Sequence, residues 1–135
     1  MIAYVDASAL LRIVLGQPSP HPAWGTWELA FTSALTEVEA LRTLDRLRLS
    51  HLLTDPEVSR HLEVLRGIWR TLDVVALDER VLRHAGQPFP TSLGTLDSLH
   101  LASALLWAER NPDPMHFLTH DEQLRTAARA VGFRT

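Results

Sequence analysis

Short β-prone runs alternate along this chain with longer stretches whose apolar residues recur at helical spacing. The runs at residues 2–5, 30–33, 73–77 and 115–119 predict strands, and residues 133–135 suggest a short final one. Helices are predicted at residues 6–15, 24–29, 36–47, 55–69, 78–86, 95–110 and 121–131. Such alternation implies right-handed crossovers and a parallel sheet covered on both faces. The pattern therefore predicts a single three-layer α/β/α domain over residues 1–135, with a central parallel sheet of four to five strands.

Local signals place several helix ends. Pro56 stands at a favoured first-turn position of the helix at 55–69. Asp78 is a natural N-cap for the helix that follows it. In the helix at 36–47, a three-residue apolar step predicts a core-facing stripe made of Val38, Leu41, Leu44 and Leu47.

Composition excludes several kinds of chemistry. The chain has no cysteine, which removes disulfides, thiolate nucleophiles and cysteine-bound metal sites. All 13 basic residues are arginine, so no lysine is present to form a Schiff base. Any contact with a phosphate group must therefore come from an arginine, a hydroxyl or a backbone N–H. No apolar run reaches the roughly 20 residues that span a bilayer, and the first residues lack the basic start of a signal peptide. We therefore predict no membrane association and a cytoplasmic location, which the absence of disulfides suits.

Acidic residues stand where the predicted strands end. Asp6 follows the first strand, Glu39 lies one helical turn past the second, and Asp121 follows the fourth. Asp97 lies in the first turn of the helix that precedes the fourth strand. Ligands of parallel α/β folds bind outside the carboxyl ends of the strands. Clustered carboxylates repel one another unless a cation lies between them, and oxygen ligands suit Mg²⁺ or Mn²⁺. This spacing is compatible with a metal site that activates water for phosphoryl displacement.

Each acid also has an explanation in helix capping. Asp6 and Asp121 both precede helices, where Asp is a favoured N-cap. Thr36 and Glu39 have the spacing of a capping box, and Asp97 complements the dipole of its helix. The spacing alone therefore leaves a metal site and four helix-start acids as alternatives.

The net charge does not decide between these alternatives. The chain carries −3 at neutral pH, whereas nucleic-acid-binding proteins usually have a basic surface. The four acids contribute −4 of this charge, so the remaining residues sum to +1. A bound cation would neutralise part of the acidic cluster, and the balance neither favours nor excludes an RNA substrate.

Four segments together resemble the PIN-domain family, in particular the toxin component of VapBC-type toxin–antitoxin pairs. They occur in the family's order across nearly the whole chain. The segments are residues 4–11 (YVDASALL), 33–42 (SALTEVEALR), 96–104 (LDSLHLASA) and 117–124 (FLTHDEQL).

The resemblance assigns roles to individual residues. Glu39 is preferred to Glu37 because it stands three residues before Arg42, as in the family's Glu-x-x-Arg pattern. Ser8 and Thr119 match hydroxyl positions near the family's metal site. By this resemblance, the catalytic and metal-binding acids are Asp6, Glu39, Asp97 and Asp121.

The resemblance also implies an activity and partners. Family members are Mg²⁺- or Mn²⁺-dependent endoribonucleases that cut specific cellular RNAs, often tRNA or ribosomal RNA. A cognate antitoxin protein blocks the site, and members usually form homodimers. The alternative from another class is a non-catalytic PIN-fold module that binds RNA or protein. Aspartyl-phosphate chemistry is disfavoured, because a dehalogenase-like enzyme would have a second Asp where Ser8 stands and a receiver domain would need a lysine.

Two histidines lie near the predicted ligands, where they could transfer protons or contact phosphate. His100, three residues after Asp97, is expected to serve helix packing or to lie on the surface. His120, beside Asp121, is expected to be a solvent-facing loop residue.

Overall fold

The central sheet of the protein has four parallel strands. The structure is a computed structural model that describes all residues from Met1 to Thr135. The strands are paired in the order β3-β2-β1-β4, which places β1 inside the sheet between β2 and β4. They are β1 (Ile2–Val5), β2 (Leu29–Ser33), β3 (Asp73–Val75) and β4 (Met115–Leu118). The final strand expected at residues 133–135 is reduced to an isolated bridge between His116 and Arg134.

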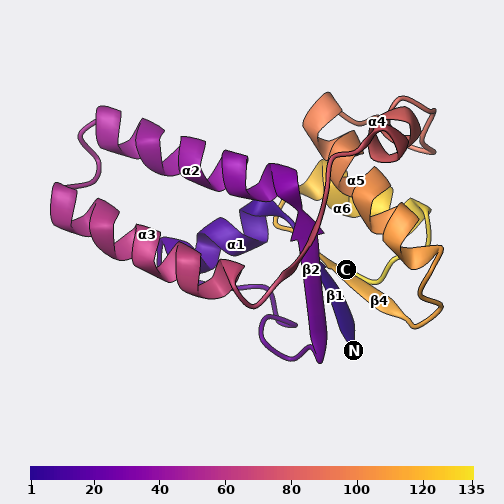
Figure 1. Cartoon of the computed structure of the whole chain (residues 1–135), viewed down its shortest axis with the longest axis horizontal. Helices are drawn as coiled ribbons and strands as arrows, with labels where there is room; N and C mark the ends of the chain where they lie inside the picture. The colour runs from indigo at the N-terminus through magenta and orange to yellow at the C-terminus, as the bar shows by residue number, and fades with distance from the viewer.

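Six helices surround this sheet (Figure 1). The first helix follows β1 directly, the second follows β2, and the last follows β4. None of the six is both long and apolar enough to cross a membrane. They are α1 (Ala7–Val14), α2 (Ala34–Leu49), α3 (Asp55–Trp69), α4 (Glu79–Ala85), α5 (Thr95–Ala108) and α6 (Glu122–Ala130).

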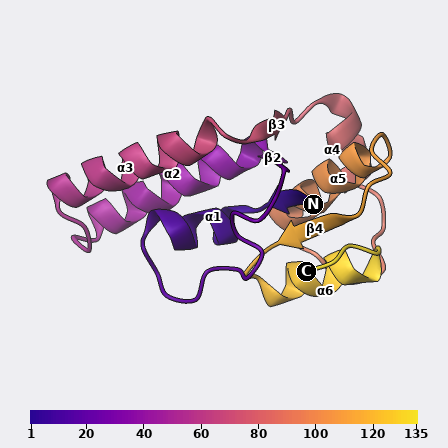
Figure 2. The same cartoon turned by 90° about the horizontal axis from the view of Figure 1, so that it is seen from below.

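The helices form two layers on opposite faces of the sheet (Figure 2). Alternate residues of a strand point to opposite faces, so Ala3 and Val5 pack against α1, α2 and α3, whereas Tyr4 packs against α5 and α6. Phe31 of β2 joins Tyr4 and stacks on Trp107 of α5, with ring centroids 4.1 Å apart. The helix α4 packs on α5. The predicted three-layer α/β/α class is therefore confirmed.

The helix predicted at residues 24–29 is wrong. The segment forms turns, and Gly25 adopts a φ of 76°, outside the right-handed helical region. The apolar spacing there has another cause. The rings of Trp24 and Trp27 lie edge-to-face with centroids 5.0 Å apart, and both side chains pack against the core on the α1 side of the sheet.

The core-facing stripe predicted on α2 is also wrong in part. Val38 is 56% exposed and Leu41 is 41% exposed, whereas Ala40 and Leu44 are buried. A helix turns once in 3.6 residues, so a strict three-residue step drifts out of the core while a four-residue step stays nearer to it. The helix begins earlier than expected because Ser33 is its N-cap, with the Ser33 side chain accepting from the Leu35 backbone N–H.

Candidate active site

The candidate acids lie around the carboxyl ends of β1 and β4, where the strand order reverses. From β1 the chain moves outward to β2 and β3, and β4 then pairs with the other edge of β1. The helix that follows β1 packs on one face of the sheet, and the helix that follows β4 packs on the other. Ligand sites of open parallel sheets form at such a point, because the two diverging helices leave a crevice between them.

Asp6 lies at this switch point, between the end of β1 and the start of α1. Its side chain is 3% exposed and caps α1, with Oδ1 accepting from the Ala9 backbone N–H at 2.8 Å. Its own backbone N–H donates to the Leu118 carbonyl of β4 at 3.1 Å. The capping role considered for Asp6 is thus confirmed. A carboxylate can accept about four hydrogen bonds. The Asp6 carboxylate can therefore cap the helix and still bind a ligand.

Two hydroxyl groups hold the Asp6 carboxylate in place. Thr119 Oγ1 donates to Asp6 Oδ2 at 2.6 Å, and Ser8 Oγ lies 2.8 and 2.9 Å from the two carboxylate oxygens. Both hydroxyls are themselves oriented by backbone donors, since the N–H of His120 donates to Ser8 and the N–H of Asp121 to Thr119. The structure therefore places Ser8 and Thr119 beside Asp6, the first of the predicted ligands.

The other three acids reach this edge from different layers. Asp121 caps α6 by accepting from the Leu124 backbone N–H at 2.8 Å. Asp97 lies in the first turn of α5, half-buried and without a hydrogen bond. Glu39 comes from α2, on the opposite side of the sheet from α5. The capping box considered for Glu39 is not formed, because Thr36 lies inside the helix and is not its N-cap.

Electrostatics show that the four carboxylates are close enough to affect one another. Burial, followed by the negative charge of Asp121, raises the pKa of Asp97, and the charges of Asp6 and Glu39 raise it further. Burial also raises the pKa of Asp6, although hydrogen bonds from Thr119, Ala9 and Ser8 oppose the shift. The crevice thus concentrates negative charge that the protein does not compensate with a salt bridge to any arginine.

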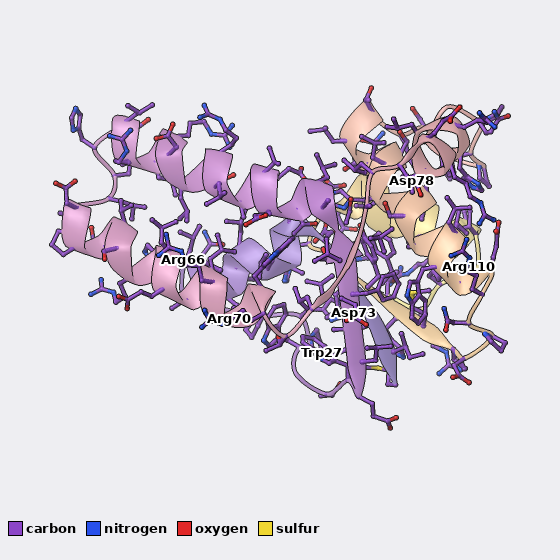
Figure 3. The ribbon with its side chains drawn as sticks, in the orientation of Figure 1. Trp27, Arg66, Arg70, Asp73, Asp78 and Arg110 are labelled. Carbon is purple, nitrogen blue, oxygen red and sulfur yellow. The ribbon has the colours of Figure 1, made fainter.

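Glu37, the alternative to Glu39, lies elsewhere. It lines a surface groove between α2 and α3 together with Trp69, Arg66 and Arg70. The last two are labelled along α3 in Figure 3. Arg42, which guided the choice of Glu39, pairs with Asp45 on the outer surface of α2 and does not reach the crevice.

His100 is a member of the site that the sequence did not identify as one. It is buried in α5, its Nε2 lies 2.5 Å from Glu39 Oε1, and its Nδ1 lies 2.7 Å from the Tyr4 hydroxyl. The available signal was its spacing, because a residue three positions after Asp97 lies on the same helix face. Surface exposure is wrong, whereas packing is confirmed: His100 is buried and its ring lies edge-to-face to Tyr4, with centroids 6.0 Å apart. Its contact with Glu39 was not predicted.

His120 was expected to face solvent, and this too was wrong. The ring is half-buried and packs edge-to-face against His21 with centroids 6.2 Å apart. Its Nε2 is buried without a hydrogen-bond partner. Burial is the main cause that lowers the pKa of both imidazoles, and the charge of Arg12 lowers that of His120 further.

The donor set fits a hard divalent cation. Carboxylate oxygens are the ligands that Mg²⁺ and Mn²⁺ prefer, and a cation would relieve the repulsion that raises the pKa of Asp97. No three His, Asp or Glu side chains converge closely enough to form a ready-made ion site as they lie here. The fit therefore rests on the chemistry and charge of the four acids.

A separate hollow of about 430 Å³ lies at the opposite end of the sheet. It is lined by Glu28 and Asp113, but also by the Met1 amino group and Arg134. The Met1 amino group pairs with Glu28 at 3.4 Å. Opposite charges balance here, so this hollow lacks the uncompensated carboxylates of the crevice.

The raised pKa of Asp97, caused by burial and by neighbouring carboxylates, predicts a stability change. The raised pKa means that ionised Asp97 is less favourable in the fold than in the unfolded chain, so the metal-free protein loses stability as pH rises through the folded pKa. The helix dipole opposes this, but the net pKa shift is upward. We expect Asp97→Asn, in EDTA at pH 7, to raise the free energy of unfolding by about 0.2–1 kcal/mol, the scale of partly solvated charges.

Urea unfolding at pH 7 and near pH 4 measures this effect. The gain should shrink toward pH 4, because the wild-type carboxyl then takes up its proton. If the Asp97→Asn variant is instead less stable than the wild type at pH 7, Asp97 contributes favourably to the metal-free fold, contrary to this prediction.

Comparisons with known proteins cover nearly the whole chain. The family model for the PIN domain matches residues 3–130. The chain is 32% identical over 132 residues to Ribonuclease VapC47 of Mycobacterium tuberculosis (strain CDC 1551 / Oshkosh), covering 98% of this chain and 93% of that protein. It is 30% identical over 132 residues to Ribonuclease VapC46 of Mycobacterium tuberculosis (strain ATCC 25618 / H37Rv), and the match covers 96% of this chain and 92% of that protein. The crystal structure of PAE2754 from Pyrobaculum aerophilum matches with a TM-score of 0.54 at 20% identity, and the match covers 94% of this chain and 87% of that one. At this identity the likeness is evidence for the fold alone.

Proposed function

Because this chain belongs to the PIN-domain family, we propose that it is a Mg²⁺- or Mn²⁺-dependent endoribonuclease that hydrolyses RNA phosphodiester bonds. The observation that carries the proposal is the gathering of four acids around the carboxyl ends of β1 and β4, where Asp121, Asp6 and Glu39 all act on the charge of Asp97. Two relatives that bear the name ribonuclease match this chain over nearly their full length, which supports the substrate class.

In this proposal the four acids hold the metal ion, and Ser8 and Thr119 support them. The bound ion supplies an activated water and neutralises charge on the scissile phosphate. The protein contributes a carboxylate held in one orientation: Asp6 accepts hydrogen bonds from Thr119, Ser8 and the Ala9 backbone, and its backbone is tied to β4. Such preorganisation means that little rearrangement is needed when charge develops in the transition state.

We further propose that the protein is the toxin of a type II toxin–antitoxin pair, cytoplasmic and dimeric, with a cognate antitoxin that blocks the crevice. The relatives' name VapC and the four segments that resemble VapC-type toxins support this. Exposed apolar side chains on and between α2 and α3 support contacts with another protein chain. They are Val38, Leu41, Leu49, Leu52 and Val64.

Cleavage of total cellular RNA by the purified chain, freed of bound protein, tests the nuclease. Reactions with Mg²⁺, with Mn²⁺ and with EDTA should show cutting that depends on the metal. Sequencing the 5′ ends of the products would then identify whether tRNA, ribosomal RNA or another RNA is cut. If folded, metal-supplied protein binds RNA or a protein partner but cuts nothing in a broad RNA panel, the non-catalytic PIN-fold module is the better description.

A further inference from the structure

Three buried or half-buried side chains form a hydrogen-bonded series that crosses the layers of the fold. The Tyr4 hydroxyl on β1 lies 2.7 Å from His100 Nδ1 on α5, and His100 Nε2 lies 2.5 Å from Glu39 Oε1 on α2. Tyr4 is fully buried, the side chain of His100 is 3% exposed, and that of Glu39 is 25% exposed. The series thus runs from the interior of the sheet to a partly exposed acid on α2.

The direction of each hydrogen bond follows from the available donors. A phenol O–H can donate to a ring nitrogen that carries no proton, and the Tyr4 hydroxyl lies 2.7 Å from His100 Nδ1. A carboxylate only accepts, so Nε2 must carry the proton that points at Glu39. An imidazole with its proton on Nε2 donates to Glu39 and accepts from Tyr4 at Nδ1, so both ring nitrogens of His100 have a partner.

We propose that His100 is a positioning residue that holds Glu39 for binding of the divalent cation, and that Tyr4 holds His100 in turn. The inference rests on the proposed metal-dependent function. Glu39 has a long, rotatable side chain on a helix, and ordering such a side chain costs conformational entropy. The bond from Nε2 occupies one carboxylate oxygen and leaves Oε2 available to the ion. Partners of this kind, which orient a metal ligand, typically change metal affinity by about 10- to 100-fold when they are removed.

A purely structural role for His100 predicts a different result. In that case its loss would lower stability without a specific effect on the metal, and any effect would add to that of losing Glu39. If His100 acts through Glu39, removing it matters only while the carboxylate is present. A double-mutant cycle separates the two cases.

Binding of Mn²⁺ alone, measured by electron paramagnetic resonance of the free ion, provides the readout. We expect His100→Leu to weaken Mn²⁺ binding by about 10- to 100-fold. We expect Glu39→Gln to weaken it as well, and the His100→Leu/Glu39→Gln double variant to bind like Glu39→Gln. The control is Ser103→Ala, which removes a buried hydroxyl that donates to the Leu99 carbonyl in the same helix. It should keep wild-type Mn²⁺ affinity even if it loses stability.

Two conservative variants keep the test valid if His100→Leu does not fold. Gln at position 100 places an amide N–H near the position of Nε2, so His100→Gln should recover most of the affinity. Tyr4→Phe removes only the hydroxyl that holds the imidazole, and should weaken binding by less than His100→Leu. Metal-free thermal unfolding of each variant shows which proteins are folded.

The outcomes distinguish this inference from the proposed function. Wild-type protein that neither binds Mn²⁺ nor cuts RNA would overturn both. Wild-type protein that binds and cuts, with unchanged affinity in the folded His100 variants, would overturn the positioning role alone. Additive losses in the double variant would also overturn it, because they would mean that His100 does not act through Glu39.

Discussion

We expect the Asp6→Asn variant to lose RNA cleavage by at least about 100-fold and to remain folded, as when a preorganised electrostatic group is removed from an active site. The amide keeps the size of the side chain, and its oxygen can still accept from the Ala9 backbone N–H that caps α1. The substitution removes the negative charge of Asp6 and the oxygen Oδ2 that accepts a hydrogen bond from Thr119. Initial rates of RNA cleavage with saturating Mn²⁺ measure the loss.

Asp78→Asn is the matched control for this experiment. Asp78 is also the N-cap of a helix, and its carboxylate accepts from the Val81 backbone N–H at 2.9 Å. It lies at the start of α4, where Figure 3 labels it, and none of the four candidate acids belongs to that helix. The Asp78→Asn variant should cut RNA at the wild-type rate. Equal activity of the Asp6→Asn variant and the wild type would contradict the assignment of Asp6 as a catalytic acid.

The second large effect is a loss of stability when the apolar core between the sheet and α5 is truncated. Leu101 of α5 is fully buried and belongs to the apolar cluster that contains Tyr4, Phe31 and Phe117. Truncating a buried leucine loses its burial and leaves a cavity. We expect Leu101→Ala to lower the free energy of unfolding by about 2–5 kcal/mol. This is a large share of the roughly 5–15 kcal/mol that stabilises a typical domain.

Leu96→Ala provides the comparison within the same helix. Leu96 is 50% exposed at the start of α5, so its truncation should change stability by less than about 0.5 kcal/mol. Urea unfolding followed by circular dichroism measures both variants. Similar losses for the two leucines would mean that α5 does not pack on the sheet through Leu101.

Local patterns in the sequence predicted much of the site because its acids also have local roles. Asp6 and Asp121 each cap the helix that follows a strand, so the same residue ends one element and begins the next. Their position at the carboxyl ends of parallel strands follows from the alternation of strands and helices. Glu39 and Asp97 lie near the starts of helices, where capping or the helix dipole could also explain an acid in the sequence, so the resemblance to the PIN-domain family was needed to favour them as ligands.

Errors arose where tertiary contacts overrode a local spacing. The apolar step on α2 suggested that Val38 and Leu41 face the core, but the helix packs through Ala40 and Leu44. Gly25 prevents the short helix that the two neighbouring tryptophans suggested. For α2, the position at which the helix starts decided which residues face the core. At residues 24–29, the backbone conformation of Gly25 is incompatible with a helix.

By itself, the sequence determined the class of fold, the ends of most helices and the four acids proposed to hold a metal. These depend on periodicity, capping and short motifs, which act between residues close together in the chain. Only the tertiary structure decided that β1 pairs with β4, and that α2 and α5 approach the crevice from opposite faces of the sheet. The contact of His100 with Tyr4 and Glu39 depends on that arrangement, because it joins residues 96 and 61 positions apart. No local pattern encodes such a contact, since it forms only when the three layers pack together.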